Sequence, residues 1–152
     1  TRGDVAALLG VRLQSVLASA ASRRSSVATD VRGHWASRWI VEVIRTGVME
    51  VFANHSFQPA SIVRRSDLAQ AASRVLALLN ATPGRAERSR VSLADVAPTH
   101  LRYDDIATAV AAGVLSLEGG TFRPSRAVTG QEAVDAVRRL EQVAARSRAG
   151  SR

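Results

Sequence analysis

The sequence contains no cysteine and no lysine, and aromatic residues make up only 4% of its 152 residues. The absence of cysteine excludes a disulfide framework, a thiolate metal site and a cysteine nucleophile. No run of about 18 apolar residues occurs, so the sequence predicts no membrane-spanning helix. Because alanine, valine and leucine supply most of the 46% hydrophobic content, closely packed helices are favoured over a β-sandwich.

All 21 basic residues are arginine, and together with 13 acidic residues they give a net charge of +8. A complete lack of lysine is consistent with a GC-rich coding bias, so the arginine count alone says little about function. The excess of positive charge is still a physical property, because it attracts carboxylates, phosphates and nucleic acid. Arginine also makes planar, bidentate contacts with such groups. Composition therefore favours an anionic partner.

One pattern of residues occurs twice in the chain, at an offset of 65 or 66 (95 − 30 = 65 and 100 − 34 = 66). The first copy contains Asp30-Val31, His34-Trp35-Ala36, Ile40, Gly47-Val48, Phe57-Gln58-Pro59 and Arg65-Ser66-Asp67. The second contains Asp95-Val96, His100-Leu101, Ile106, Gly113-Val114, Phe122-Arg123-Pro124 and Gly130-Gln131-Glu132. Thr1-Arg2-Gly3-Asp4 resembles the closing motif of an earlier copy. Such repeats indicate one supersecondary unit that is copied and packed against its neighbours.

Apolar residues at helical spacing predict an all-α fold with helices over about 1–21, 36–46, 65–80, 102–112 and 130–146. Gly47 and Gly113 are placed to end two of them in the left-handed conformation. Capping boxes are expected at Thr1 and Thr129, and Phe57 is expected to be buried. Polar linkers are predicted over 22–29 and 81–92.

We therefore expect a single domain, 1–152, built from helix–loop–helix units. Residues 1–21 would be the end of repeat 1, 30–80 repeat 2, 95–146 repeat 3, and 147–152 a frayed tail. The chain starts inside a repeat without methionine, so we expect Thr1 to be the edge of a processed or partial chain, from which a targeting segment could have been lost.

The ordered motifs of both copies resemble the S-layer homology family. Its repeat reads Asp-Val, His-Trp-Ala, an isoleucine, Gly-Ile or Gly-Val, a glycine-rich turn, Phe-x-Pro and a Thr-Arg-Ala-Glu helix start. The resemblance implies three repeats around a pseudo-threefold axis, the first of them truncated here. It also implies a non-catalytic module without cofactor or metal, which anchors a protein to the bacterial cell envelope, at the cell surface or in the periplasm.

In that family an anionic, often pyruvylated, wall polysaccharide binds in grooves between repeats. The resemblance implies Arg2, Trp35 and Arg65 as the residues that line them. A helix-start arginine beside unpaired backbone amides suits a carboxylate. The second copy departs from the pattern, since Leu101 replaces the tryptophan and Gly130 the arginine.

These departures keep a second reading open, in which the chain is a structural or docking subunit of a larger envelope assembly with a protein partner. Nucleic-acid binding through the arginines is a third and weaker reading, because no basic segment interleaved with aromatic residues occurs. No acid–base–nucleophile set is visible, so an enzyme is the least favoured class.

Several residues invite a catalytic reading but are better explained by structure. His34 and His100 recur at equivalent positions without clustered carboxylates, so we expect each to make a stabilising hydrogen bond. Asp30 and Asp95 are expected to cap or brace the first helix of each unit. Trp39, on the apolar face of its helix, is expected in the core.

Overall fold

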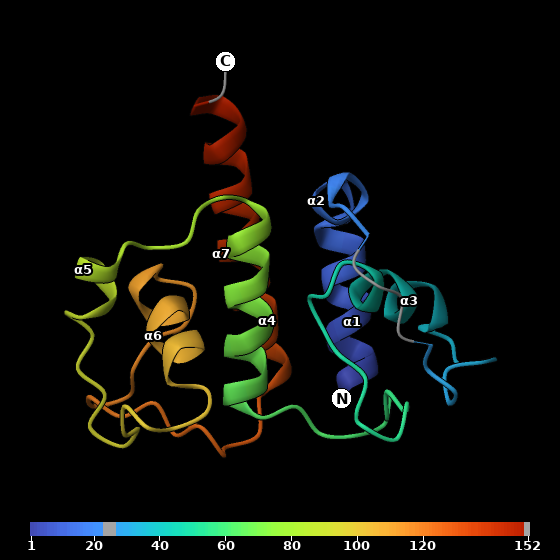
Figure 1. The fold of residues 1–152 in the computed structure, drawn as a ribbon, viewed down its shortest axis with the longest axis horizontal. Coiled ribbons are helices and arrows are strands. Elements are labelled where there is room, and N and C mark those ends of the chain that lie inside the picture. The colour runs from blue at the N-terminus through green and yellow to red at the C-terminus, as the bar shows by residue number, and fades with distance from the viewer. Residues whose placement is uncertain (23–26, 151–152) are drawn as a thin grey trace. The chain divides into compact units, whose positions relative to one another are not determined.

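The computed structural model describes residues 1–22 and 27–150, and this part of the chain is helical, without a β-sheet (Figure 1). The result confirms the predicted all-α class. The helices are α1 (Arg2–Arg12), α2 (Gln14–Ser19), α3 (Ser37–Arg45), α4 (Arg65–Leu78), α5 (Arg85–Arg88), α6 (Tyr103–Ala111) and α7 (Gly130–Gly150). None of the described helices is long and apolar enough to cross a membrane. Arg23 and Arg24 of the predicted linker lie outside the described residues.

The predicted helix ends are mostly confirmed. Gly47 and Gly113 have φ values of 74° and 69°, as expected for residues that end a helix in the left-handed region. The first helix is divided at Leu13, and the four-residue α5 inside the linker was not predicted. The tail was expected to fray from 147, but α7 continues to Gly150, since alanine and arginine favour helix.

The chain folds into two compact units, Thr1–Val63 and Arg64–Arg152. Their boundary falls inside the predicted repeat 2, between its Phe-x-Pro loop and its closing helix α4. Each unit therefore joins the closing helix of one sequence repeat to the front half of the next. The pseudo-threefold arrangement of three repeats stays a prediction.

In the first unit, α1 packs against α3. Thr1 caps α1 in a complete capping box with Asp4, as predicted. Phe57, from the Phe-x-Pro loop, is fully buried, which confirms the expectation for this residue. The largest buried side chains of this unit are Leu9, Leu13, Leu17, Ile40, Val43, Val48 and Phe57.

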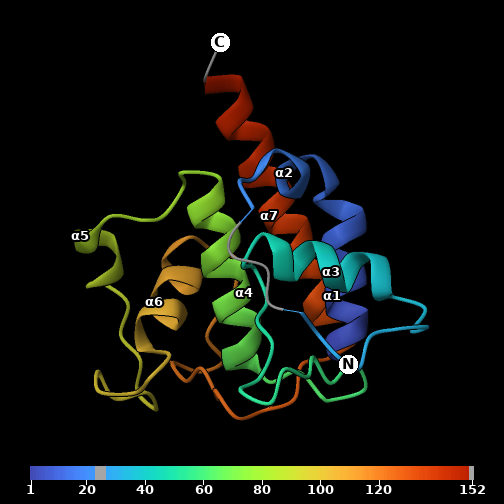
Figure 2. The same ribbon diagram turned by 45° about the vertical axis from the view of Figure 1, so that its right-hand side comes forward.

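In the second unit, α4 packs against both α6 and α7, and Figure 2 shows α7 running beside α4. Thr129 caps α7, because its hydroxyl accepts a hydrogen bond of 3.1 Å from the Glu132 amide. Phe122 is fully buried, like Phe57 in the first unit. The largest buried side chains here are Leu68, Leu76, Ile106, Phe122 and Leu140.

Candidate functional site

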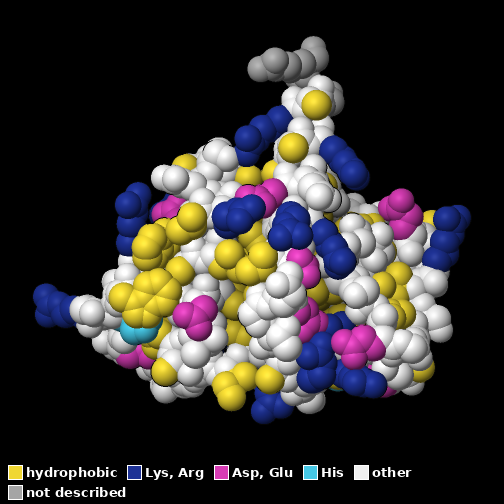
Figure 3. All heavy atoms as spheres, turned by 180° about the vertical axis from the view of Figure 1, so that it is seen from behind, with side chains coloured by type: hydrophobic (Ala, Val, Ile, Leu, Met, Phe, Trp, Pro, Cys, Tyr) yellow, Lys and Arg dark blue, Asp and Glu magenta, His cyan; other side chains and the backbone are white. Residues whose placement is uncertain are grey.

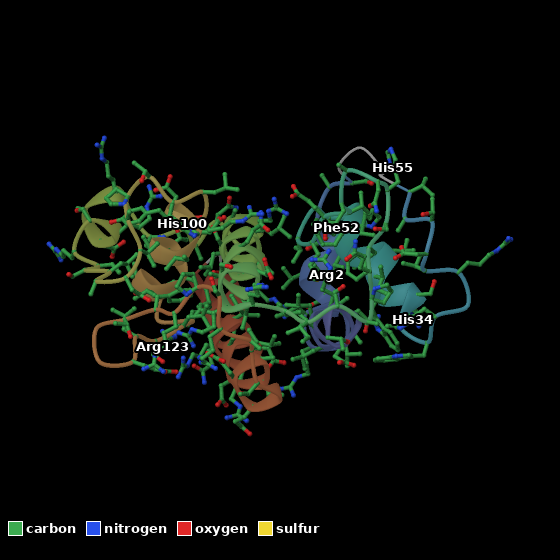
Figure 4. All side chains as sticks on the ribbon, turned by 90° about the horizontal axis from the view of Figure 1, so that it is seen from below. Arg2, His34, Phe52, His55, His100 and Arg123 are labelled. Carbon is green, nitrogen blue, oxygen red and sulfur yellow. The ribbon has the colours of Figure 1, made fainter. Side chains whose placement is uncertain are left out.

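The arginines that begin α1 and α4 are each inserted into the loop of their own unit. Arg2 donates from Nε to the Phe57 carbonyl at 2.8 Å and from Nη2 to the Glu50 carbonyl at 2.7 Å. Its guanidinium carbon lies 4.5 Å from the ring centroid of Phe57 and 4.7 Å from that of Phe52, toward which Arg2 points in Figure 4. Arg2 thus ties the Phe-x-Pro loop to α1 by hydrogen bonds and cation–π contact.

Arg65 makes the same contacts in the second unit. Its Nε donates to the Phe122 carbonyl at 2.6 Å and its Nη2 to the Ser116 carbonyl at 2.7 Å. The guanidinium carbon lies 4.6 Å from the Phe122 ring centroid. Two arginines 63 residues apart (65 − 2 = 63) therefore fasten equivalent loops, a role that the sequence motif alone did not reveal.

Arg65 differs from the half-buried Arg2 in its burial and its ion pairs. Only 3% of its side chain is exposed, and its guanidinium pairs with Glu132 and, at 3.9 Å, with Glu118. Burial lowers the pKa of Arg65 below its ordinary value, and the nearby charge of Arg126 lowers it further. The nearby carboxylate of Glu118 acts in the opposite direction and favours the charged form.

The backbone amides at these helix starts are already paired, contrary to the expectation of unpaired donors. The amides of Arg2 and Gly3 donate to the carbonyls of Ser61 and Pro59, both at 2.8 Å. In the second unit the Arg65 amide donates to the Arg126 carbonyl at 2.9 Å. The loops thus supply partners for groups that a helix leaves free, and an anion would not find these amides open.

Asp30 and Asp95 hold the Phe-x-Pro loops and do not cap helices, which corrects the sequence-based expectation. Asp30 accepts two hydrogen bonds of 2.7 Å from the amides of Phe57 and Gln58. Asp95 accepts bonds of 2.7 and 2.6 Å from the amides of Phe122 and Arg123. Burial opposes ionisation of each carboxyl, but the amide hydrogen bonds outweigh it, so both pKa values lie below the ordinary value.

This depression predicts acid lability. The stability that Asp30 and Asp95 contribute is present above the unfolded-state pKa of about 3.9 and is lost as the pH falls through the lower folded-state pKa. We expect the urea midpoint to drop below about pH 4 in the natural protein. The double variant Asp30→Asn/Asp95→Asn should lose stability at neutral pH and show a weaker acid decline. Asp104→Asn, which leaves both loops intact, is the control; an unchanged acid decline in the double variant would contradict this.

The two recurring histidines make the predicted structural hydrogen bond. Nδ1 of His34 accepts from the Ala36 amide, and Nδ1 of His100 accepts from the Arg102 amide, both at 3.1 Å. His55 lies well away from His34 in Figure 4. Among the described residues, no group of three histidine or acidic side chains is placed to hold a metal ion.

The two tryptophans lie together in the first unit. Trp35 is 63% exposed, and its ring centroid lies 5.7 Å from that of His34 and 6.2 Å from that of Trp39. Trp39 is half-buried, so the expectation of a core position is only partly met. At the position equivalent to Trp35 in the second unit, Leu101 is 87% exposed.

The second unit contains a charged cleft of about 350 Å³. Its ionisable lining residues are Arg65, Arg126, Arg139, Glu118, Glu132 and Asp135. Arg126 donates from Nη2 to Glu118 and Glu132 at 3.0 Å, and the three arginines of the lining face three acidic residues, so the formal charges of the cleft balance. Of the three predicted ligand residues, Arg65 lines this cleft. Trp35 packs beside Trp39, which lines a separate cleft in the first unit. Direct contact of any of them with a glycan stays a prediction.

Comparison with known protein families gives a match in the second unit. Residues 92–134 match the S-layer homology domain. This segment contains α6, the second Phe-x-Pro loop and the first turn of α7. Comparisons with curated proteins and with solved structures gave no significant match.

S-layer homology domains are generally non-catalytic modules that bind cell-wall polymers and mediate anchoring to the wall. They imply an association with the cell surface or envelope in bacteria. The match at residues 92–134 therefore supports the S-layer homology resemblance of this chain.

Proposed function

We propose that this chain is a non-catalytic attachment module that holds a protein on the bacterial cell envelope by binding an anionic cell-wall polysaccharide. The observation that carries the proposal is the S-layer homology match at residues 92–134. The same loop, clasped by an arginine and an aspartate, occurs in both units. The net charge of +8 attracts a polyanion over several ångströms of solvent.

Trp35, Arg2 and Arg65 are the residues that we propose for the glycan. Trp35 presents a flat apolar face to solvent, which suits the apolar face of a sugar ring. Arg65 lines the charged cleft, where its guanidinium would hold Glu132 and the loop of the second unit in place beside a ligand. Arg2 would act by holding the loop of the first unit in place.

Binding to purified wall fragments tests this function. We expect the protein to co-sediment with fragments that carry their acidic polysaccharide, and to be released as salt screens the charges. Trp35→Ala should weaken binding about tenfold, because truncation of an aromatic anchor commonly costs more than about 1 kcal/mol. Leu101→Ala is the matched control, since Leu101 is exposed at the equivalent position. Binding that does not depend on salt concentration and is unchanged by Trp35→Ala would overturn the proposal.

A docking role in an envelope assembly is the second candidate, favoured by one observation. Leu101 is 87% exposed where the first copy has its tryptophan, so the second unit offers an apolar side chain in place of an aromatic platform. Wall fragments stripped of their polysaccharide distinguish the two functions. Glycan anchoring predicts that the chain no longer binds these fragments, whereas docking to an envelope protein predicts unchanged binding.

Nucleic-acid binding finds no further support. On the face drawn in Figure 3, acidic side chains lie among the arginine side chains. A nucleic-acid site instead shows a continuous basic stripe or patch.

A further inference from the structure

The first unit contains a cleft that the sequence did not predict. Its volume is about 380 Å³, within the range of about 300–1,000 Å³ that is usual for small-ligand pockets. It is lined by Gly10, Val11, Gln14, Ala18, Arg38, Trp39 and Glu42. We call it the Trp39 cleft.

A glycine makes the aromatic wall of this cleft possible. A Cβ atom on Gly10 would lie 2.3 Å from Cδ1 of Trp39 and 2.8 Å from its Cβ and Cγ. Trp39 can therefore rest across α1 only because position 10 has no side chain. The indole stays half-buried there and lines the cleft.

The wall continues outward through Trp35. The two indole rings lie 6.2 Å apart at an interplanar angle of 60°. Trp35 is 63% exposed, so the apolar surface runs from the cleft into solvent. These two are the chain's only tryptophans, which places its most sugar-compatible surface at one site.

The polar groups of the cleft leave a positive charge available. Both carboxylate oxygens of Glu42 are taken by Arg45, at 2.7 and 3.1 Å. The hydrogen bond from Arg45 lowers the pKa of Glu42 although burial opposes it, so one carboxylate faces the two arginines Arg45 and Arg38 and leaves a net positive charge. The side chains of Arg38 and Gln14, by contrast, form no hydrogen bond with the described residues, although the charge of Arg38 also favours the ionised form of Glu42. Their donors are free to meet a ligand.

We propose that the Trp39 cleft binds one carboxylate-bearing sugar residue of the wall polysaccharide. Trp39 and Trp35 contact the apolar face of the sugar ring, Arg38 pairs with the carboxylate, and Gln14 bonds to hydroxyls. This inference rests on the proposed anchoring function and assigns its sugar contact to residues outside the helix-start arginines.

Tryptophan fluorescence tests the cleft directly, with soluble acidic polysaccharide released from wall fragments as the probe. The variant Trp35→Phe leaves Trp39 as the single emitter. We expect saturable quenching or a blue shift of its emission. The same polysaccharide with its carboxylates converted to methylamides should give at least about a fivefold weaker response, since a charge-assisted contact is lost.

Arg38→Gln should weaken binding to wall fragments about fivefold to tenfold. Arg32→Gln is the matched control, because Arg32 is also exposed in the first unit but does not line the cleft. The cleft proposal would be overturned if Arg38→Gln bound wall fragments as well as the natural protein and if polysaccharide did not change the emission of Trp39. That result would leave the anchoring function intact. Absence of wall binding by the natural protein would overturn both proposals.

Discussion

Arg65→Met is expected to lower the free energy of unfolding of the second unit by about 3–5 kcal/mol, the usual cost of removing one partner of a buried ion pair. The substitution keeps most of the apolar stem but removes the guanidinium. Glu132, which is only 16% exposed, would lose its more buried partner and keep only the ion pair with Arg126. The carbonyls of Phe122 and Ser116 would lose their donors as well.

Urea unfolding followed by circular dichroism, with hydrogen exchange at the Phe122 and Arg123 amides, measures this effect. Arg2→Met is the matched comparison, and since Arg2 is only half-buried we expect a smaller loss of about 1–2 kcal/mol. Adding Glu132→Leu to Arg65→Met should recover part of the loss, because an apolar pair replaces a largely buried carboxylate that has lost one of its two arginine partners. A change below about 0.5 kcal/mol in Arg65→Met would contradict the structural role.

This role also bears on how Arg65 is tested as a ligand residue. Loss of wall binding in an Arg65 variant would follow from unfolding of its loop as readily as from a lost contact. Substitutions at exposed positions can distinguish a lost ligand contact from unfolding of the loop. The comparisons of Trp35→Ala with Leu101→Ala, and of Arg38→Gln with Arg32→Gln, are therefore better tests of glycan binding than an Arg65 variant.

The sequence predicted the helices well because their signals are local. Apolar spacing located α1, α3, α4, α6 and α7, and glycines with positive φ fixed two helix ends. The pairing of each closing helix with the next repeat's loop was not predictable in this way. It depends on Arg2 and Arg65 reaching carbonyls 48 to 57 residues away, and no spacing rule encodes such a contact.

Asp30 and Asp95 illustrate the same limit. An aspartate before a helix is typical of a cap, and both were expected to act on the helix that follows. Their partners are instead loop amides 27 and 28 residues away. The recurrence of aspartate at equivalent positions indicated a structural role for Asp30 and Asp95. Their hydrogen-bond partners could be identified only in the folded chain.

The Trp39 cleft was missed because helical periodicity assigned Trp39 to the core. Spacing along α3 cannot reveal that the facing position on α1 is Gly10, 29 residues away (39 − 10 = 29). The indole of Trp39 lies against Gly10, and the cleft opens beside the two residues. The half-burial of Trp39 therefore depends on Gly10 as well as on its own position in α3.

Gly10→Val is expected to lower the free energy of unfolding by about 2–3 kcal/mol. Valine would overlap the Trp39 indole, where even a Cβ lies at 2.3 Å, and overpacking typically costs about 1–3 kcal/mol. The ring must then swing into solvent, so the emission of Trp39 in a Trp35→Phe background should shift to longer wavelength. Gly130→Ala is the control, because a Cβ there meets open space; it should be neutral or stabilising by up to about 1 kcal/mol. If Gly10→Val keeps full stability and an unchanged Trp39 emission, the close approach of Trp39 to α1 is refuted, and the wall of the Trp39 cleft with it.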